Sequence, residues 1–280
     1  MPLQSSLHYL YFEGGNPIHP IPVILIHGNG QEASLWPPML RRLEGYRVFA
    51  VDLPGHGRSP GTGLHSVETY AQVITEFMAT MRLSRACLVG TSLGGAVALY
   101  LGLEYPGLVR AVGLISSGPC VSLPAPWLEA LESPLLRAEA LRSLEGHLLL
   151  ATTPRSIAHL VLQTLAHQRP EVRSADWKAL ARFDVRERLS TLRVPTWAIF
   201  GAHDPLVPSA LVRQLRRSAP GWLQVEIVPD SGHWVWLEQP GMVSRRLRAF
   251  LARAMTPSET PTWLPYPKDA EALDSREEST

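Results

Sequence analysis

The chain has 280 residues, of which 45% are hydrophobic and 18% charged, and its formal net charge is +1. This length suits one large α/β domain or two small ones, and the composition is that of an ordinary globular protein. A near-neutral charge without a run of Lys or Arg argues against a nucleic-acid-binding protein, which carries a basic patch.

Short apolar runs alternate with longer helical patterns along the chain. Runs with strand character cover residues 22–27, 46–51, 85–90, 109–116, 195–201 and 222–228. Helical patterns cover residues 66–81, 93–104 and 238–254. Near-continuous apolar strands indicate a parallel sheet that is covered on both faces. The alternation of strands with helices therefore predicts an α/β fold with a doubly wound, mostly parallel sheet.

One long segment breaks this alternation. Residues 119–192 contain helical patterns and no convincing strand, and a segment of that length is usually functional. We predict that it is a helical insertion between the two parts of the core, residues 1–118 and 193–255. The tail at 256–280 begins with several prolines and ends in Glu, Asp, Ser and Thr, so we expect it to be poorly ordered.

The sequence also bears on the setting in which the protein works. Met1 to Phe12 lack a basic segment followed by an apolar stretch, so we expect no signal peptide. No apolar run reaches the ~18 residues that a membrane span needs. The ten histidines offer no pair with metal-ligand spacing, and the two cysteines make no disulfide framework. We expect a cytoplasmic monomer or homodimer that holds no metal.

A serine in a glycine-flanked motif is the first candidate for chemistry. Residues 90–94 read Gly-Thr-Ser-Leu-Gly, which is G-x-S-x-G, and they lie between a predicted strand and a predicted helix. In that setting this motif presents a nucleophilic serine. Glycine on both sides relieves steric conflict in a tight turn and lets the hydroxyl project from the sheet. We therefore predict that Ser92 is a nucleophile rather than part of a plain helix start.

A serine nucleophile needs a base, and the base needs an orienting acid. His233 and Asp204 each follow one of the last two predicted strands, so both are expected at the sheet edge where Ser92 lies. The chain order of nucleophile, acid and base is typical of hydrolases with this serine motif. The sequence therefore predicts a catalytic triad of Ser92, Asp204 and His233. The alternative for Asp204 is a turn-forming residue before Pro205.

Two further loops follow predicted strands. The segment at 27–30 reads His-Gly-Asn-Gly, and in such hydrolases one backbone N–H for the oxyanion comes from this loop and another from the residue after the nucleophile. These are the N–H groups of Asn29 and Leu93. We expect the side chain of His27 to brace this loop. Residues 52–59, with their Pro and Gly, are expected to support the site.

Five motifs in register resemble those of the α/β-hydrolase superfamily: HGNG, DLPGHGRS, GTSLGG, GAHD and SGHW. The resemblance spans Leu7 to Ala254 and is strongest to the small capped serine hydrolases, which include carboxylesterases, enol-lactonases and carbon–carbon bond hydrolases. It implies that the helices of residues 119–192 form a cap over the site and that residues 7–14 match the family's second strand. It also implies that Gly28 and Trp234 lie beside the substrate.

The resemblance implies a carboxylesterase that cleaves carboxylic esters or lactones of small, largely apolar substrates through an acyl-enzyme on Ser92, without a cofactor. Dehalogenases and epoxide hydrolases of the superfamily carry Asp as nucleophile, so the serine argues against both. Three alternatives remain: a carbon–carbon bond hydrolase of aromatic ring-cleavage products, a cofactor-free haloperoxidase or perhydrolase, and a non-catalytic ligand receptor. Candidates for the cap arginine that the first of these uses are Arg155, Arg169, Arg173 and Arg182.

Overall fold

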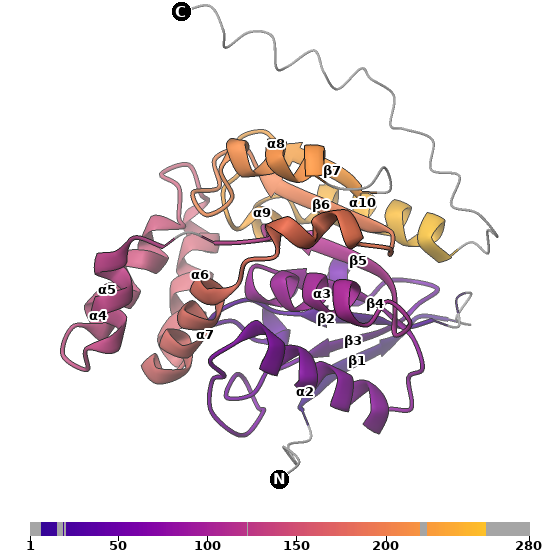
Figure 1. Ribbon diagram of the computed structural model, residues 1–280, viewed down its shortest axis with the longest axis horizontal. Coiled ribbons are helices and arrows are strands. Elements are labelled where there is room, and N and C mark those ends of the chain that lie inside the picture. Colours follow the sequence, from indigo (N-terminus) through magenta and orange to yellow (C-terminus); the bar gives the residue numbers. More distant parts are fainter. Residues whose placement is uncertain (1–6, 16–18, 20, 122, 219–222, 256–280) are drawn as a thin grey trace, which may run out of the picture.

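A mostly parallel sheet forms the centre of the protein. The computed structural model describes residues 7–15, 19, 21–121, 123–218 and 223–255, so the tail expected at 256–280 lies outside the described residues. The sheet has seven strands in the order β1-β3-β2-β4-β5-β6-β7 (Figure 1). β1 pairs antiparallel with β3, and the other neighbouring strands are parallel. The predicted sheet type is confirmed.

Six of the seven strands match the apolar runs of the sequence, and β1 lies within residues 7–14, where the family resemblance implied a strand. They are β1 (Tyr9–Glu13), β2 (Val23–Ile26), β3 (Arg47–Val51), β4 (Ala86–Thr91), β5 (Val109–Ile115), β6 (Thr196–Gly201) and β7 (Leu223–Val228). Every residue of β2, β4 and β6 is buried, because helices cover both faces of the central strands. Edge strand β1 is less buried, and its residues Tyr11 and Glu13 are exposed.

Helices cover the two faces of the sheet. The helices outside the insertion are α1 (Pro38–Arg41), α2 (Val67–Thr80), α3 (Leu93–Glu104), α8 (Ser209–Ser218), α9 (Val235–Glu238) and α10 (Pro240–Met255). In Figure 1, α2 and α3 lie in front of the sheet. A Cβ on Gly102 of α3 would meet Val112 of β5, whereas Trp197 of β6 stacks on Phe250 of α10. Because Trp197 pairs with the residue after Val112, α3 and α10 cover opposite faces.

The segment predicted as an insertion consists mainly of helices. They are α4 (Ala125–Glu132), α5 (Arg137–His147), α6 (Arg155–His167) and α7 (Pro170–Arg182), and they extend to one side of the sheet in Figure 1. An isolated bridge between Cys120 and Asp184 joins the two ends of the segment. Its division from the core as a separate domain stays a prediction. Within the described part of the chain, no helix is long and apolar enough to cross a membrane. The cytoplasmic location and the oligomeric state stay predictions.

The turn between β4 and α3 depends on glycine. A Cβ on Gly94 would lie 2.1 Å from the carbonyl oxygen of Ile26 in β2, and a Cβ on Gly90 would lie 2.1 Å from the backbone of Gly94. Real Cβ atoms do not approach backbone atoms so closely. The start of α3 therefore lies directly against β2, in a space that admits no side chain.

We predict that Gly94→Ala destabilises the protein by about 3 kcal/mol or more, because the backbone of Ile26 and His27 leaves the added methyl group no space. Chemical denaturation of purified protein measures this change. Gly107→Ala is the matched control, since nothing lies within 4 Å of the added Cβ. Equal stability of the Gly94 variant and the wild type would contradict this account of the turn.

Candidate active site

Ser92 occupies the sharp turn between β4 and α3. Its backbone has φ 48° and ψ −116°, a left-handed conformation that is costly for a residue with a side chain. The turn is held on both sides, because the Ser92 N–H donates to the Ile115 carbonyl at 3.0 Å and Ser117 Oγ donates to the Ser92 carbonyl at 2.7 Å. The backbone strain predicted for this serine is present, and these hydrogen bonds hold the backbone in the strained conformation.

Asp204 and His233 meet at the carboxyl edge of the sheet. Asp204 follows β6, and its Oδ2 lies 3.0 Å from Nδ1 of His233, which follows β7. Both side chains are almost fully buried. Asp204 Oδ1 also accepts from the backbone N–H groups of Leu206 at 2.9 Å and Val207 at 3.3 Å. The carboxylate is therefore fixed in place by its own loop and can orient the imidazole.

A glutamate fixes the loop that carries His233. Glu238, at the end of α9, accepts from the N–H of Gly232 at 2.8 Å through Oε2. Its other oxygen accepts from the hydroxyl of Thr153 at 2.8 Å, just before α6 begins. The histidine loop is thus joined to the insertion through one carboxylate.

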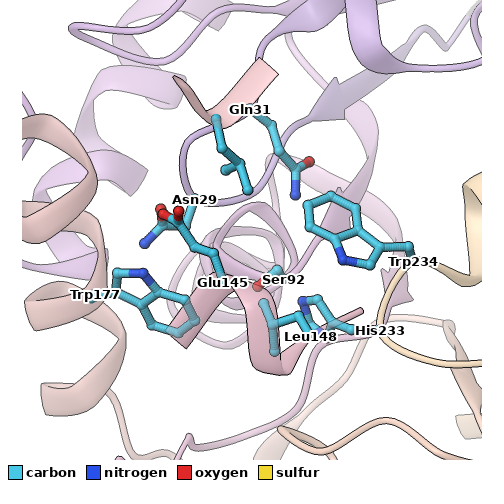
Figure 2. A pocket seen from close by; sticks show the side chains of 9 residues that line it. Asn29, Gln31, Ser92, Glu145, Leu148, Trp177, His233 and Trp234 are labelled. Carbon is cyan, nitrogen blue, oxygen red and sulfur yellow. The ribbon is translucent and has the colours of Figure 1, made fainter. Parts of the chain in front are cut away.

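Ser92 and His233 line one pocket. The other lining residues are Asn29, Gln31, Glu145, Leu148, Leu165, Trp177 and Trp234. Figure 2 shows the Ser92 and His233 side chains at the centre of the view, with Trp177 on one side and Trp234 on the other. The insertion therefore supplies four of the lining residues. Of the two residues expected beside the substrate, Trp234 lines this pocket.

Gly28 is placed differently from Trp234. A Cβ on Gly28 would lie 3.0 Å from Cβ of Ser92 and 2.7 Å from Nε2 of Gln31. Its N–H donates to Oε1 of Gln31 at 3.0 Å, so the segment after β2 folds back on itself. Glycine is required here because the loop passes directly beside the serine, and Gly28 is not among the residues that line the pocket.

Of the two residues whose backbone N–H groups are expected to hold an oxyanion, Asn29 lines the same pocket, and Leu93 directly follows Ser92, which also lines it. Leu93 begins α3, so its N–H is at the positive end of a helix. Asn29 belongs to the loop after β2, and its side-chain Nδ2 donates to the Arg173 carbonyl at 3.1 Å. Within the part of the chain that the structure describes, neither backbone N–H has a hydrogen-bond acceptor.

Asp176 of α7 ties the insertion to this loop. Its Oδ2 accepts from the N–H of Gly30 at 3.3 Å and lies 2.8 Å from Nε2 of His56, and its Oδ1 accepts from the Tyr70 hydroxyl. The carboxylate is completely buried. Burial and the neighbouring carboxylate raise the pKa of Tyr70, which keeps its hydroxyl protonated as a donor. No motif in the sequence singled out Asp176.

A buried ion pair lies beside the pocket. Arg173 of α7 donates to both carboxylate oxygens of Glu145 in α5, through Nε at 2.8 Å and through Nη2. Burial raises the pKa of Glu145, and the hydrogen bond from Arg173 opposes this rise. Among the four arginines named as candidates, Arg155, Arg169 and Arg182 are exposed, and Arg173 is committed to Glu145.

Two histidines support the loops, and their pKa values are shifted in opposite directions. His27 Nε2 accepts from the Leu53 N–H at 2.9 Å, and its Nδ1 lies 2.8 Å from the Gly28 carbonyl, which suits a neutral ring. Burial, together with the nearby His56, lowers the pKa of His27 to about 4. Burial also disfavours the charge on His56, but the Asp176 carboxylate outweighs it and raises the pKa of His56. His27 braces the loop, as the sequence suggested.

The described residues hold no group of three His, Cys, Asp or Glu side chains arranged to bind a metal ion.

Comparisons with known proteins agree with this fold. The family model described as "Alpha/beta hydrolase family" matches residues 23–271. A pimeloyl-[acyl-carrier protein] methyl ester esterase from Yersinia enterocolitica is 30% identical over 254 residues, which are 84% of this chain and 94% of the relative. An esterase of the same name from Pectobacterium atrosepticum is 30% identical over 243 residues, which are 81% and 93% of the two chains.

Solved structures also resemble the protein. A thermophilic esterase from Thermogutta terrifontis superposes with a TM-score of 0.79 at 24% identity, over 91% of this chain and 96% of that one. An enol-lactonase from Burkholderia xenovorans gives a TM-score of 0.76 at 21% identity, over 89% and 98%. At these identities the likeness concerns the fold.

We predict that stability depends on pH through His27 and His56, with opposite signs. Between pH 6.5 and about pH 4, His27 binds a proton in the unfolded chain but not in the folded protein. Acidification over this window therefore lowers the free energy of unfolding by about 3 kcal/mol. The raised pKa of His56 stabilises the fold fully below pH 6.5, and this contribution is lost as the pH rises through that pKa.

Urea unfolding of the wild type and of His27→Gln between pH 4.5 and 6.5 tests the contribution of His27. The variant should be less stable at pH 6.5, and its free energy of unfolding should fall less on acidification. His65→Gln, at an exposed site, should retain the wild-type slope. An unchanged slope in the His27 variant would show that His27 carries no such shift.

Proposed function

This chain belongs to the alpha/beta hydrolase family, and we propose that its nucleophile is Ser92, its general base His233 and its orienting acid Asp204. Its relatives are esterases, so the chain is an ester hydrolase. One observation carries the assignment of roles: a strained serine shares one pocket with a histidine whose Nδ1 lies 3.0 Å from a buried carboxylate. Base and orienter are held in the arrangement that activates a serine hydroxyl.

The proposed reaction is acyl transfer to water. Nε2 of His233 takes the proton of Ser92 Oγ as the oxygen attacks the ester carbonyl carbon. The imidazolium then protonates the leaving alkoxide, and an acyl-enzyme remains on the serine. His233 next takes a proton from water as the water oxygen attacks the acyl-enzyme. It returns this proton to Ser92 Oγ when the bond from Oγ to the acyl carbon breaks and the carboxylic acid leaves. Asp204 holds the imidazole in the tautomer with Nδ1–H and stabilises its charged form.

We assign the oxyanion hole to the backbone N–H groups of Asn29 and Leu93. Two observations support this assignment. Neither N–H group has an acceptor within the described residues, and Leu93 lies at the positive end of α3. The Asp176 hydrogen bond to the Gly30 N–H holds the Asn29 loop in place from the insertion.

The pocket favours small, largely apolar substrates. Its volume, with the part open to solvent included, is about 250 Å³. Leu148, Leu165, Trp177 and Trp234 provide an apolar wall. A carbon–carbon bond hydrolase is less well supported, because the buried cap arginine, Arg173, is neutralised by Glu145.

The relatives favour a narrower second candidate, the methyl ester of an acyl chain carried on an acyl-carrier protein. Release of methanol from pimeloyl-[acyl-carrier protein] methyl ester by the wild type, and not by Ser92→Ala, would support it. A wild type that hydrolyses small esters and leaves the carrier-bound ester intact would exclude it.

We predict that Ser92→Ala lowers kcat for p-nitrophenyl butyrate by about 10⁴-fold or more, and Asp204→Asn by about 10⁴-fold, because each removes one part of the proton-transfer unit. Release of p-nitrophenol measures both. Ser34→Ala, at an exposed site, should match the wild type. A Ser92 variant with wild-type turnover would exclude this residue as the nucleophile.

We also predict that Leu165 limits the length of the acyl group. In the p-nitrophenyl series from acetate to decanoate, the wild type should prefer short acyl groups, and Leu165→Ala should move the optimum to longer ones. The matched control is Leu160→Ala on the same helix, because Leu160 is 44% exposed. An unchanged optimum in the Leu165 variant would show that this side chain does not bound the acyl site.

A further inference from the structure

Three residues that line the pocket carry buried polar atoms without a partner. Within the described residues, Oδ1 of Asn29, Nε1 of Trp177 and Nε1 of Trp234 form no hydrogen bond. Their residues are at most 6% exposed. Leaving such an atom unpaired costs free energy, so buried polar atoms normally have partners. Three such atoms belong to residues that line one pocket, where a polar group of a ligand can supply the missing partners.

The unpaired atoms divide between two sides of the pocket. In the view of Figure 2, Asn29 and Trp177 lie on one side of Ser92, and Trp234 lies on the other. The Asn29 amide nitrogen is held by the Arg173 carbonyl at 3.1 Å, so the unpaired atom of this side chain is an acceptor. The Trp177 indole N–H is a donor. Two of the residues that line this side of the pocket thus carry one unpaired acceptor and one unpaired donor.

The charges beside the pocket favour a neutral ligand group on this side. Glu145 lines the pocket, and both of its carboxylate oxygens receive hydrogen bonds from the buried Arg173. The guanidinium charge is therefore already balanced. A substrate carboxylate would have to displace Glu145, whereas a neutral group can bind without breaking the ion pair.

We propose that Asn29 and Trp177 form a subsite for a secondary amide in the acyl part of the ester substrate, a few bonds from the scissile carbonyl. The amide N–H donates to Oδ1 of Asn29, and its C=O accepts from Nε1 of Trp177. The substrate class is then esters of N-acylated amino acids. This inference rests on the proposed ester hydrolysis and specifies which esters the same site selects.

Three methyl esters of matched length test the two hydrogen bonds separately. Methyl pentanoate has no polar group in its chain, methyl 4-oxopentanoate adds the acceptor, and methyl N-acetylglycinate adds the donor as well. Each kcat/KM is divided by the rate constant for alkaline hydrolysis of the same ester, which removes intrinsic reactivity. We expect the corrected value to rise about tenfold at each step, since each step gives a buried atom its partner.

A tryptophan variant assigns the donor. Trp177→Phe should reduce the preference for methyl 4-oxopentanoate over methyl pentanoate to near unity. Trp36→Phe is the matched control, because Nε1 of Trp36 is also buried and unpaired but this residue does not line the pocket. It should keep the wild-type preference, and so should Trp234→Phe. Loss of the preference in the Trp234 variant instead would overturn the assignment to Trp177.

The outcomes separate this subsite from the proposed function. Equal corrected rates for all three esters would overturn the subsite and leave ester hydrolysis standing, with ordered water as the partner of the three atoms. A folded wild type that hydrolyses neither these esters nor p-nitrophenyl butyrate would refute the proposed function, and the subsite with it.

Discussion

The close approach of α3 to β2 is the constraint on which the site depends. Because Gly90 and Gly94 have no side chains, the helix can begin directly against the neighbouring strand. The chain must then turn within one residue, and Ser92 takes the left-handed conformation that this turn requires. The same turn places the Leu93 N–H at the start of the helix, directly after Ser92. A single packing contact thus sets both the serine and one N–H of the proposed oxyanion hole.

The insertion supplies four of the nine residues that line the pocket, and it is tied to the core beside the site. Asp176 joins α7 to the loop after β2 through Gly30 and to the loop after β3 through His56, and all of these contacts are buried. Removing one partner of a buried charged pair leaves an uncompensated charge, so this connection resists change. α6, by contrast, buries completely only Val161 and Leu165. Within the insertion, α7 is therefore joined to the core by buried hydrogen bonds, whereas α6 buries few of its residues.

Charge at the site is balanced in pairs, and this limits what the pocket can recognise. Arg173 faces Glu145, and the imidazole of His56 faces Asp176, so neither side chain is free to bind a substrate anion. Selectivity then rests on hydrogen bonds and shape. Hydrogen-bonding sites discriminate well, because a ligand that lacks the matching group leaves buried atoms unpaired.

The sequence by itself determined the sheet, the order of its strands along the chain, and the turn that carries Ser92. These features depend on local patterns, namely apolar runs, glycine spacing and the positions of Asp204 and His233 after strands. Only the tertiary structure decided which residues of the insertion reach the pocket. Trp177 and Asp176 lie within an ordinary helical pattern, and nothing local separates them from Arg182, which is exposed. Their role follows from how α7 lies against the loop after β2. The periodicity of a single helix does not predict such long-range packing.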